Sequence, residues 1–378
     1  MWSCGRLVVR GCPQAVVSSS RGRRRWRLLS TFVGEEPLTS EERAEVSALK
    51  SALQETNRRA LAQAVTLVTS TNHRKRLKGD YLLESILAEQ KKAFEKSGAD
   101  SLVFRIGISG APGVGKSSFI ESFGKMLIKE HGKRVAVLTV DPSSQTSGGS
   151  LLGDLSRMTH LARNPNAYIR QSPTHGSLGG VTRGTQEAIT LAEGAGFDPV
   201  LVETVGVGQS EVAVAEMVDM FCLLLSPTHG DELQGVKRGI VETSDLVLVT
   251  KADGDLQARA RRAQAEQRAA LKYMRPRSSH WKPRVLLCSA HEDTGLTEAW
   301  AQMQEYWQTM VSSGALVERR RRQLDQWMWS HVTEEFRNRF RHHQKVQDVL
   351  PQLEQEVVDG LKTPGHAAEI LIHLFLDD

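Results

Sequence analysis

The chain of 378 residues is poor in cysteine, in aromatic side chains and in long apolar runs. Of its four cysteines, Cys222 and Cys288 lie within short apolar runs, which argues against a disulfide framework and predicts that both are buried. CxxC and HExxH motifs are both missing, so the sequence predicts no tightly bound metal of the protein's own. No run of about 18 apolar residues occurs, which excludes a membrane-spanning helix and makes a membrane partner unexpected.

Positive charge is concentrated at the N-terminus. The formal net charge is +5, but the first 34 residues carry seven arginines and no acid, so removing them leaves −2. A nearly neutral body argues against nucleic acid as a partner. An Arg-rich, Ser-containing, acid-free segment is typical of a mitochondrial transit peptide, which predicts that 1–34 direct the chain to the mitochondrial matrix. The alternative is a disordered basic tail.

From residue 102 onward, short apolar runs alternate with segments of helical length. The runs do not alternate polar and apolar residues, as expected for parallel strands buried on both faces. The predicted strands are Leu102–Ile108, Val135–Val140, Val200–Val202, Met220–Leu225, Leu246–Val249 and Val285–Leu287. The predicted helices between and after them are 117–130, 182–193, 233–242, 255–273 and 295–310. This alternation predicts an α/β fold with a doubly wound, mostly parallel sheet.

Helical patterns flank this α/β region on both sides. Thr39 and Glu42 form a capping-box pattern at the start of a helix predicted over 39–70, and a second helix is predicted from about Tyr81 to Phe94. The pattern is helical again beyond Ser313. The predicted parts are a transit peptide (1–34), an N-terminal helical segment (35–99), a P-loop domain (100–312) and a C-terminal helical extension (313–378).

The sequence GAPGVGKS matches the phosphate-binding pattern GxxxxGK[ST] in full. Glycines allow backbone N–H groups to close around phosphate oxygens, and the following helix adds its positive N-terminal end. Lys116 is predicted to contact the β- and γ-phosphates and to be catalytic, and the Ser117 hydroxyl to bind Mg²⁺. The predicted phosphate-site residues are Gly110, Ala111, Pro112, Gly113, Val114, Gly115, Lys116, Ser117, Ser118 and Phe119.

Two later motifs predict that the base is guanine. TKAD follows a predicted strand where GTPases place [N/T]KxD, and its aspartate can accept two hydrogen bonds that guanine offers and adenine does not. Thr stands where Asn is commoner, so one side-chain amide is lacking. SAH follows the next strand, in the position of the loop that reads the guanine O6. Taken alone, TKAD could instead be a solvated turn. The predicted base-site residues are Thr250, Lys251, Asp253, Ser289, Ala290 and His291.

Acidic residues follow two of the predicted strands. Asp141 and Glu203 are expected at the carboxyl edge of the sheet, where carboxylates can hold Mg²⁺ directly or through water. Asp154, in LLGDLSRM, is a weaker third candidate. The predicted Mg²⁺ site is therefore Ser117, Asp141, Asp154 and Glu203. Asp141 and Glu203 could instead be helix caps or turn formers.

The motif ETVG indicates a nucleotide-sensitive switch. The N–H of Gly206 can approach the γ-phosphate, so Gly206 and Glu203 are predicted to take part in hydrolysis with Lys116. A water-positioning Gln directly after the switch glycine is absent, since Val207 stands there and Gln209 comes two residues later. The sequence therefore predicts slow turnover that a partner accelerates.

Taken together, the motifs resemble the MeaB/ArgK-like family of P-loop GTPases. The resemblance rests on GAPGVGKSSFIE, VDPSSQTSGGSLLGD, ETVGVGQSE, GDELQGVKRG, TKADGDL and WMW, which span most of the chain. It implies a GTPase chaperone of adenosylcobalamin-dependent methylmalonyl-CoA mutase that gates cofactor loading and protects or reactivates the mutase, with an indirect link to adenosylcobalamin delivery. His- or Cys-rich metal tracts of related metallochaperone GTPases are missing, which argues against metal insertion.

The resemblance also implies a switch and a dimer. The switch, which couples nucleotide state to the mutase, would include Gly230, Asp231, Glu232, Gln234, Lys237 and Arg238; a solvated loop is the alternative. A homodimer would form largely through the C-terminal extension, where the WMW residues 327–329 are either interface anchors or core. Residues 319–322, four arginines, are expected to be a solvated helix face.

Two other classes of protein compete with the chaperone. A P-loop kinase acting on a protein or small molecule would use the same phosphate loop, but TKAD and SA argue against it because a kinase need not read guanine. A nucleotide-stabilised scaffold with little turnover is the third possibility.

Overall fold

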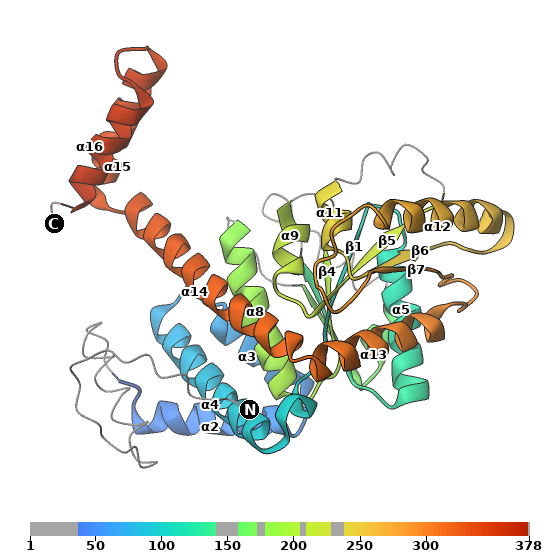
Figure 1. The fold of residues 1–378 in the computed structure, drawn as a ribbon. Coiled ribbons are helices and arrows are strands. Elements are labelled where there is room, and N and C mark those ends of the chain that lie inside the picture. Colours follow the sequence, from blue (N-terminus) through green and yellow to red (C-terminus); the bar gives the residue numbers. More distant parts are fainter. Residues whose placement is uncertain (1–36, 141–157, 172–177, 205–208, 228–237, 377–378) are drawn as a thin grey trace, which may run out of the picture.

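The computed structural model describes residues 37–140, 158–171, 178–204, 209–227 and 238–376 (Figure 1). Its seven strands are β1 (Arg105–Gly110), β2 (Val135–Val140), β3 (Ala167–Gln171), β4 (Val200–Thr204), β5 (Met220–Leu225), β6 (Leu246–Val249) and β7 (Arg284–Leu287). They form one sheet in the order β3-β2-β4-β1-β5-β6-β7, and every neighbouring pair is parallel. The predicted fold class is confirmed.

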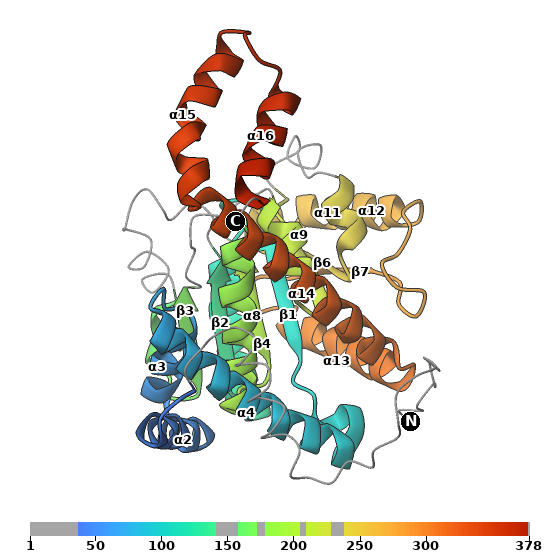
Figure 2. The same cartoon turned by 90° about the vertical axis from the view of Figure 1, so that its left-hand side faces the viewer.

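Helices cover both faces of the sheet and bury a separate apolar core on each (Figures 1 and 2). One face carries α5 (Lys116–His131), α7 (Thr159–Arg163) and α13 (Leu296–Ser312). The other carries α8 (Leu178–Gly194), α9 (Gln209–Ala215), α11 (Arg238–Thr243) and α12 (Gln257–Leu271), the last preceded by the short η2 (Gly254–Leu256). Cys222 and Cys288 are buried and free, as predicted, and burial raises the pKa of the Cys288 thiol to about 12.

The N-terminal helices are α2 (Ser40–Gln54), α3 (Arg58–Val68) and α4 (His73–Ser97), followed by the short η1 (Gly98–Ser101). The capping box of Thr39 and Glu42 is confirmed, but the single helix predicted over 39–70 is wrong. The chain turns at Thr56, whose φ is +63°, and the Asn57 side chain caps α3 by accepting from two backbone N–H groups. Buried residues of α2, α3 and α4 belong to the same core as α8, so these helices extend one face of the α/β fold.

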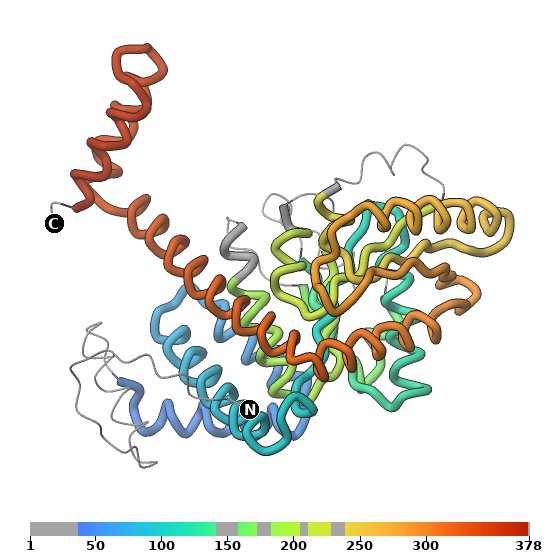
Figure 3. Tube along the Cα trace, viewed as in Figure 1, coloured from blue at the N-terminus to red at the C-terminus, as the bar shows by residue number. Residues whose placement is uncertain are grey.

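The C-terminal helices are α14 (Ala315–Arg341), α15 (Gln344–Val358) and α16 (Pro364–Leu376). Helix α14 runs along the body past α8, and α15 and α16 form a hairpin that projects away from it, a path that Figure 3 traces. Within the described part of the chain, no helix is long and apolar enough to cross a bilayer.

The first turns of α14 are held by a buried carboxylate. Asp219, fully buried before β5, lies 2.6 Å from Nη2 of Arg320 and accepts from the backbone N–H of Arg105 at 2.9 Å. Burial opposes ionisation of Asp219, but Arg320 and Arg105 outweigh it and lower the pKa of the carboxyl. The expected solvated face is thus wrong for Arg319, which donates to the Asp219 carbonyl, and for Arg320, whereas Arg321 is exposed.

Replacing Asp219 by alanine is expected to lower the free energy of unfolding by about 3–5 kcal/mol, because it removes the buried carboxylate that pairs with Arg320, whose side chain is only 12% exposed. The pKa of Asp219 is lower in the folded state than its ordinary value of 3.8, so its contribution is present above that pH and lost as the pH falls through the folded pKa. Urea unfolding followed by circular dichroism measures both effects. Asp325→Ala, on the exposed side of α14, is the control, and equal effects of the two variants would contradict the prediction.

Candidate nucleotide site

The phosphate-binding loop connects β1 to α5 at the carboxyl edge of the sheet. Gly110 ends β1 so close to β5 that a Cβ there would lie 2.5 Å from the carbonyl oxygen of Leu224. Gly115 has φ +97°, a conformation that favours glycine, and α5 begins at the next residue. The Lys116 amine donates to the carbonyls of Gly110 at 2.7 Å and Ala111 at 3.2 Å. The loop backbone and a buried ammonium group are thus gathered at the N-terminus of a helix, as anion binding requires.

Ser117 and Glu203 meet beside this loop. The Ser117 hydroxyl donates to Oε1 of Glu203 at 3.1 Å, and Glu203, at the end of β4, is only 3% exposed. A hydroxyl and a carboxylate oxygen are the kinds of ligand that Mg²⁺ takes, so these two residues fit a magnesium ion. The part of the chain that the structure describes contains no cluster of three or more His, Cys, Asp or Glu side chains suited to a metal.

Several predicted site residues lie outside the described residues. These are Asp141, Asp154, Gly206, Gly230, Asp231, Glu232, Gln234 and Lys237. Arg238, the last residue of the predicted switch, is also the first residue of α11.

The TKAD residues contact the phosphate loop directly. Thr250, 4% exposed, donates through its hydroxyl to the Val114 carbonyl at 2.7 Å, and the Lys251 amine donates to the Gly113 carbonyl at 2.7 Å. Lys251 has φ +53°, which turns the chain sharply after β6. The hydroxyl of Thr250 therefore makes a loop contact of its own, although the commoner Asn amide is missing. Sequence reasoning assigned these residues to the base and missed their contact with the loop, since spacing does not reveal it.

Asp253 and the SAH loop are held together. The Ser289 hydroxyl donates to Oδ2 of Asp253 and accepts from the backbone N–H of His291 at 3.2 Å. The Ala290 carbonyl accepts from the Ser122 hydroxyl of α5 at 2.9 Å, which ties this loop to the helix that starts at the phosphate site. The carboxylate of Asp253 and the backbone at Ala290 thus lie in one fixed arrangement.

One buried acid of the site had no predicted role. Glu211 of α9 is 2% exposed, and its Oε1 accepts from the Ser109 hydroxyl at 3.3 Å. Ser109 in turn accepts from the Thr204 hydroxyl at 3.0 Å, so the ends of β1 and β4 are linked under the phosphate loop. An acid within the otherwise small and apolar sequence SEVAVA was the available signal.

Residues 61–345 match the family model described as methylmalonyl Co-A mutase-associated GTPase MeaB. The chain belongs to the MeaB family. It is 54% identical over 330 residues to the methylmalonic aciduria type A homolog, mitochondrial, of Caenorhabditis elegans, covering 87% of this chain and 83% of that protein. It is 50% identical to the protein of the same description from Mus musculus, and the match covers 96% of this chain and 88% of that protein. GTPase ArgK of Escherichia coli is 42% identical, and the match covers 76% of this chain and 83% of that protein.

A solved structure described as the LAO/AO transport system kinase has the same fold, with a TM-score of 0.67 and 33% identity. The match covers 89% of this chain and 99% of that structure's chain. Together with the family match and the phosphate loop, these relatives show that this MeaB-family chain is a P-loop GTPase.

Proposed function

We propose that this MeaB-family GTPase is a chaperone of adenosylcobalamin-dependent methylmalonyl-CoA mutase. It would gate cofactor loading, protect or reactivate the mutase, and so contribute indirectly to adenosylcobalamin delivery. The observation that carries the proposal is the match over 61–345 to a family described as associated with this mutase. The contact of Thr250 with the phosphate loop and the hydrogen bond from Ser289 to Asp253 support GTP as the nucleotide.

In the proposed site, the phosphate-loop N–H groups and Lys116 bind the phosphates, and Asp253 accepts from the guanine N1–H and 2-amino group. Ser117 and Glu203, with Asp141 and Asp154, would hold Mg²⁺, which supplies charge neutralisation at the β- and γ-phosphates. The remaining proposed contacts are Gly110, Ala111, Pro112, Gly113, Val114, Gly115, Ser118, Phe119, Thr250, Lys251, Ser289, Ala290 and His291. Because Thr250 and Lys251 bind the loop carbonyls, a movement of the loop is passed to the base site.

The proposed output is a change in the surface offered to the mutase. Gly206 would bind the γ-phosphate through its backbone N–H in the GTP state and release it on hydrolysis. Residues 230–238 would report this change, since α11 begins at Arg238 and packs on the sheet through Ile240. Slow intrinsic turnover would keep the GTP state long enough for the partner to trigger hydrolysis.

The descriptions of the relatives support a mitochondrial location. The proteins of Caenorhabditis elegans and Mus musculus are both described as mitochondrial, and the seven arginines within residues 1–34 have the composition of a transit peptide. We therefore propose that the chain acts in the mitochondrial matrix.

The test is steady-state GTP turnover of the purified chain with and without methylmalonyl-CoA mutase, with ATP as the control nucleotide. The proposal expects slow GTP hydrolysis that the mutase stimulates several-fold, while ATP is inert. The competing function is a P-loop kinase, in keeping with the description of the solved relative. No stimulation, together with phosphate transferred from ATP to a protein or small molecule, would favour the kinase.

We propose a homodimer formed through an exposed apolar stripe on α14. Leu324, Met328, Val332 and Phe336 recur every four residues along the helix, and each is at least half exposed. Trp329 beside them is 60% exposed. A patch of this kind marks an interface, and a twofold axis would let it cover itself.

Trp327 does not belong to this stripe. Its indole donates to the Glu216 carbonyl at 3.4 Å and packs against the core of the body. Of the three WMW residues, Trp327 therefore packs on the body, whereas Met328 and Trp329 are available to a partner.

The double variant Met328→Glu/Phe336→Glu is expected to convert the dimer to a monomer, because two carboxylates would be buried at the interface without partners. Light scattering coupled to size-exclusion chromatography measures the mass. Gln326→Glu places the same charge on another face of α14 and should leave the dimer intact. A wild-type chain that is monomeric, or a double variant that stays dimeric, contradicts this interface.

A further inference from the structure

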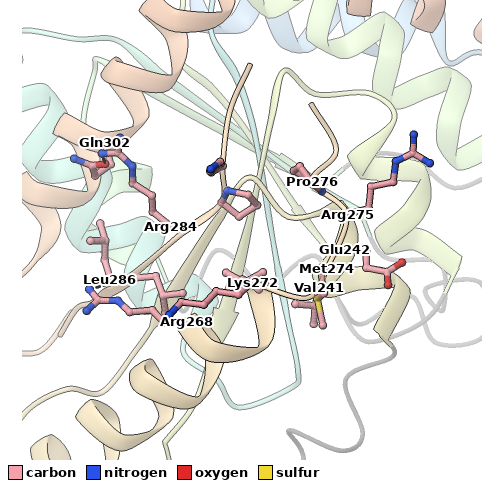
Figure 4. Close-up of a pocket in the computed structure, with 14 residues that line it drawn as sticks. Val241, Glu242, Arg268, Lys272, Met274, Arg275, Pro276, Arg284, Leu286 and Gln302 are labelled. Carbon is pink, nitrogen blue, oxygen red and sulfur yellow. Dashed lines mark hydrogen bonds between the residues drawn. The ribbon is translucent and has the colours of Figure 1, made fainter. Parts of the chain in front are cut away.

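A cavity of about 640 Å³ lies at the β7 edge of the sheet, away from the phosphate loop. Its walls come from α11, α12, β7, the connection 272–283 between α12 and β7, and Gln302 of α13 (Figure 4). None of its lining residues belongs to the proposed nucleotide site. Its volume is within the range of small-molecule sites in proteins.

The lining of this cavity is strongly basic. It includes one acidic side chain, Glu242 of α11, and five cationic side chains, from Arg268, Lys272, Arg275, Lys282 and Arg284. Figure 4 shows Arg284 on one side and Arg275 on the opposite side, with Lys272, the residue after α12, between them and Arg268 of α12 on the side of Arg284. This excess of positive charge selects an anion.

Two of the five cations are engaged and three are available. Arg284 pairs with Glu305 of α13 at 2.5 Å, and Arg268 donates to the Val285 carbonyl at 3.1 Å. The side chains of the other three make no hydrogen bond or ion pair with any residue in the described ranges of the chain. They are Lys272, Arg275 and Lys282, all exposed.

The connection that carries Arg275 and Lys282 is fixed to the body. Arg277 pairs with the buried Asp245 carboxylate at 3.0 Å, and the Trp281 indole donates to the Asp245 carbonyl at 2.8 Å. Both contacts are made to Asp245, directly before β6, so this wall of the cavity is held in place before any ligand binds. A preformed wall reduces the entropy cost of binding.

The cavity also has apolar walls, formed by Val241, Leu271, Met274 and Leu286. A peptide is a poor fit, because the edge of β7 is already capped. The Val285 carbonyl accepts from the side chains of Gln264 at 3.0 Å and Arg268 at 3.1 Å, which blocks the pairing that an added strand needs. Cations above apolar walls suit a compact anion with an organic body.

We propose that this cavity binds a small organic polyphosphate. Lys272, Arg275 and Lys282 contact its phosphate groups, and its organic part packs on Leu271 and Met274. The inference goes beyond the chaperone function and is independent of it. Val241 belongs to α11, whose first residue, Arg238, is the last residue of the proposed switch. A bound polyphosphate would therefore contact the helix that continues the segment proposed to couple nucleotide state to the mutase.

The experiment is calorimetric titration of the full chain with ADP and with inorganic pyrophosphate, after the nucleotide site has been saturated with Mg²⁺ and a fluorescent GDP analogue. We expect one saturable ADP site per chain, with the analogue still bound. Lys272→Glu/Lys282→Glu should weaken binding about tenfold or more, as expected for lost hydrogen bonds to charged groups. Arg261→Glu, on an exposed part of α12 outside the cavity, is the matched control and should bind as the wild type.

Three results would overturn the proposal. They are no saturable ADP binding while the analogue stays bound, equal weakening by the control and the double variant, and tighter binding of an octaglutamate peptide than of ADP. The last result would assign the cavity to an acidic protein segment. None of these results depends on the mutase, so the chaperone proposal fails or stands separately.

Discussion

Lys116→Ala is expected to reduce kcat for GTP hydrolysis by about 10²–10³-fold, the loss seen when one preorganised charge-stabilising group is removed from an active site. Lys116 is 8% exposed, and its ammonium group is oriented by two carbonyls of the phosphate loop. The measurement is single-turnover hydrolysis at saturating GTP, with nucleotide affinity determined separately.

Lys125→Ala is the matched control, because Lys125 lies on the exposed face of the same helix, α5. It should hydrolyse GTP as the wild type does. A Lys116 variant that keeps wild-type kcat would remove this residue from the machinery. Complete loss of mutase binding by a folded Lys116 variant would argue against a merely nucleotide-stabilised scaffold.

Asp253→Asn is expected to lower kcat/KM for GTP on the order of 10³-fold, because a site built to accept hydrogen bonds rejects a base that no longer pairs with it. An amide offers N–H groups where the carboxylate accepted from guanine. Xanthine carries a carbonyl oxygen in place of the 2-amino group, so the variant should prefer xanthosine triphosphate. The Asn oxygen can still accept from the Ser289 hydroxyl, which preserves the local arrangement.

The measurement is kcat/KM with GTP, ATP and xanthosine triphosphate for each variant. Asp255→Asn, two residues further on and exposed, should retain the wild-type preference for GTP. If Asp253→Asn hydrolyses GTP normally, guanine is read elsewhere and TKAD acts only through its contacts with the phosphate loop.

The strands show which elements a local sequence pattern can predict. β2, β5 and β6 have the bounds that the apolar runs predict, since a strand buried on both faces must be apolar throughout. β3 was not predicted, because it is an edge strand in which only Ala167 and Tyr168 are buried. The helix predicted over 39–70 is two helices because Asn57 caps the second, a turn signal that a purely apolar pattern overlooks.

By itself, the sequence determined the fold class, the phosphate loop and the family, because each depends on residues close together in the chain. The roles of the individual site residues in catalysis and in recognition of the base stay predictions. Only the tertiary structure decided which distant groups meet. It buried Arg319 and Arg320 around Asp219, a hundred residues away, and set the Thr250 hydroxyl on the phosphate loop. It also gathered cations from α12, β7 and their connection around one cavity. The energy of a charge depends on its surroundings in space, and the order of residues does not specify those surroundings.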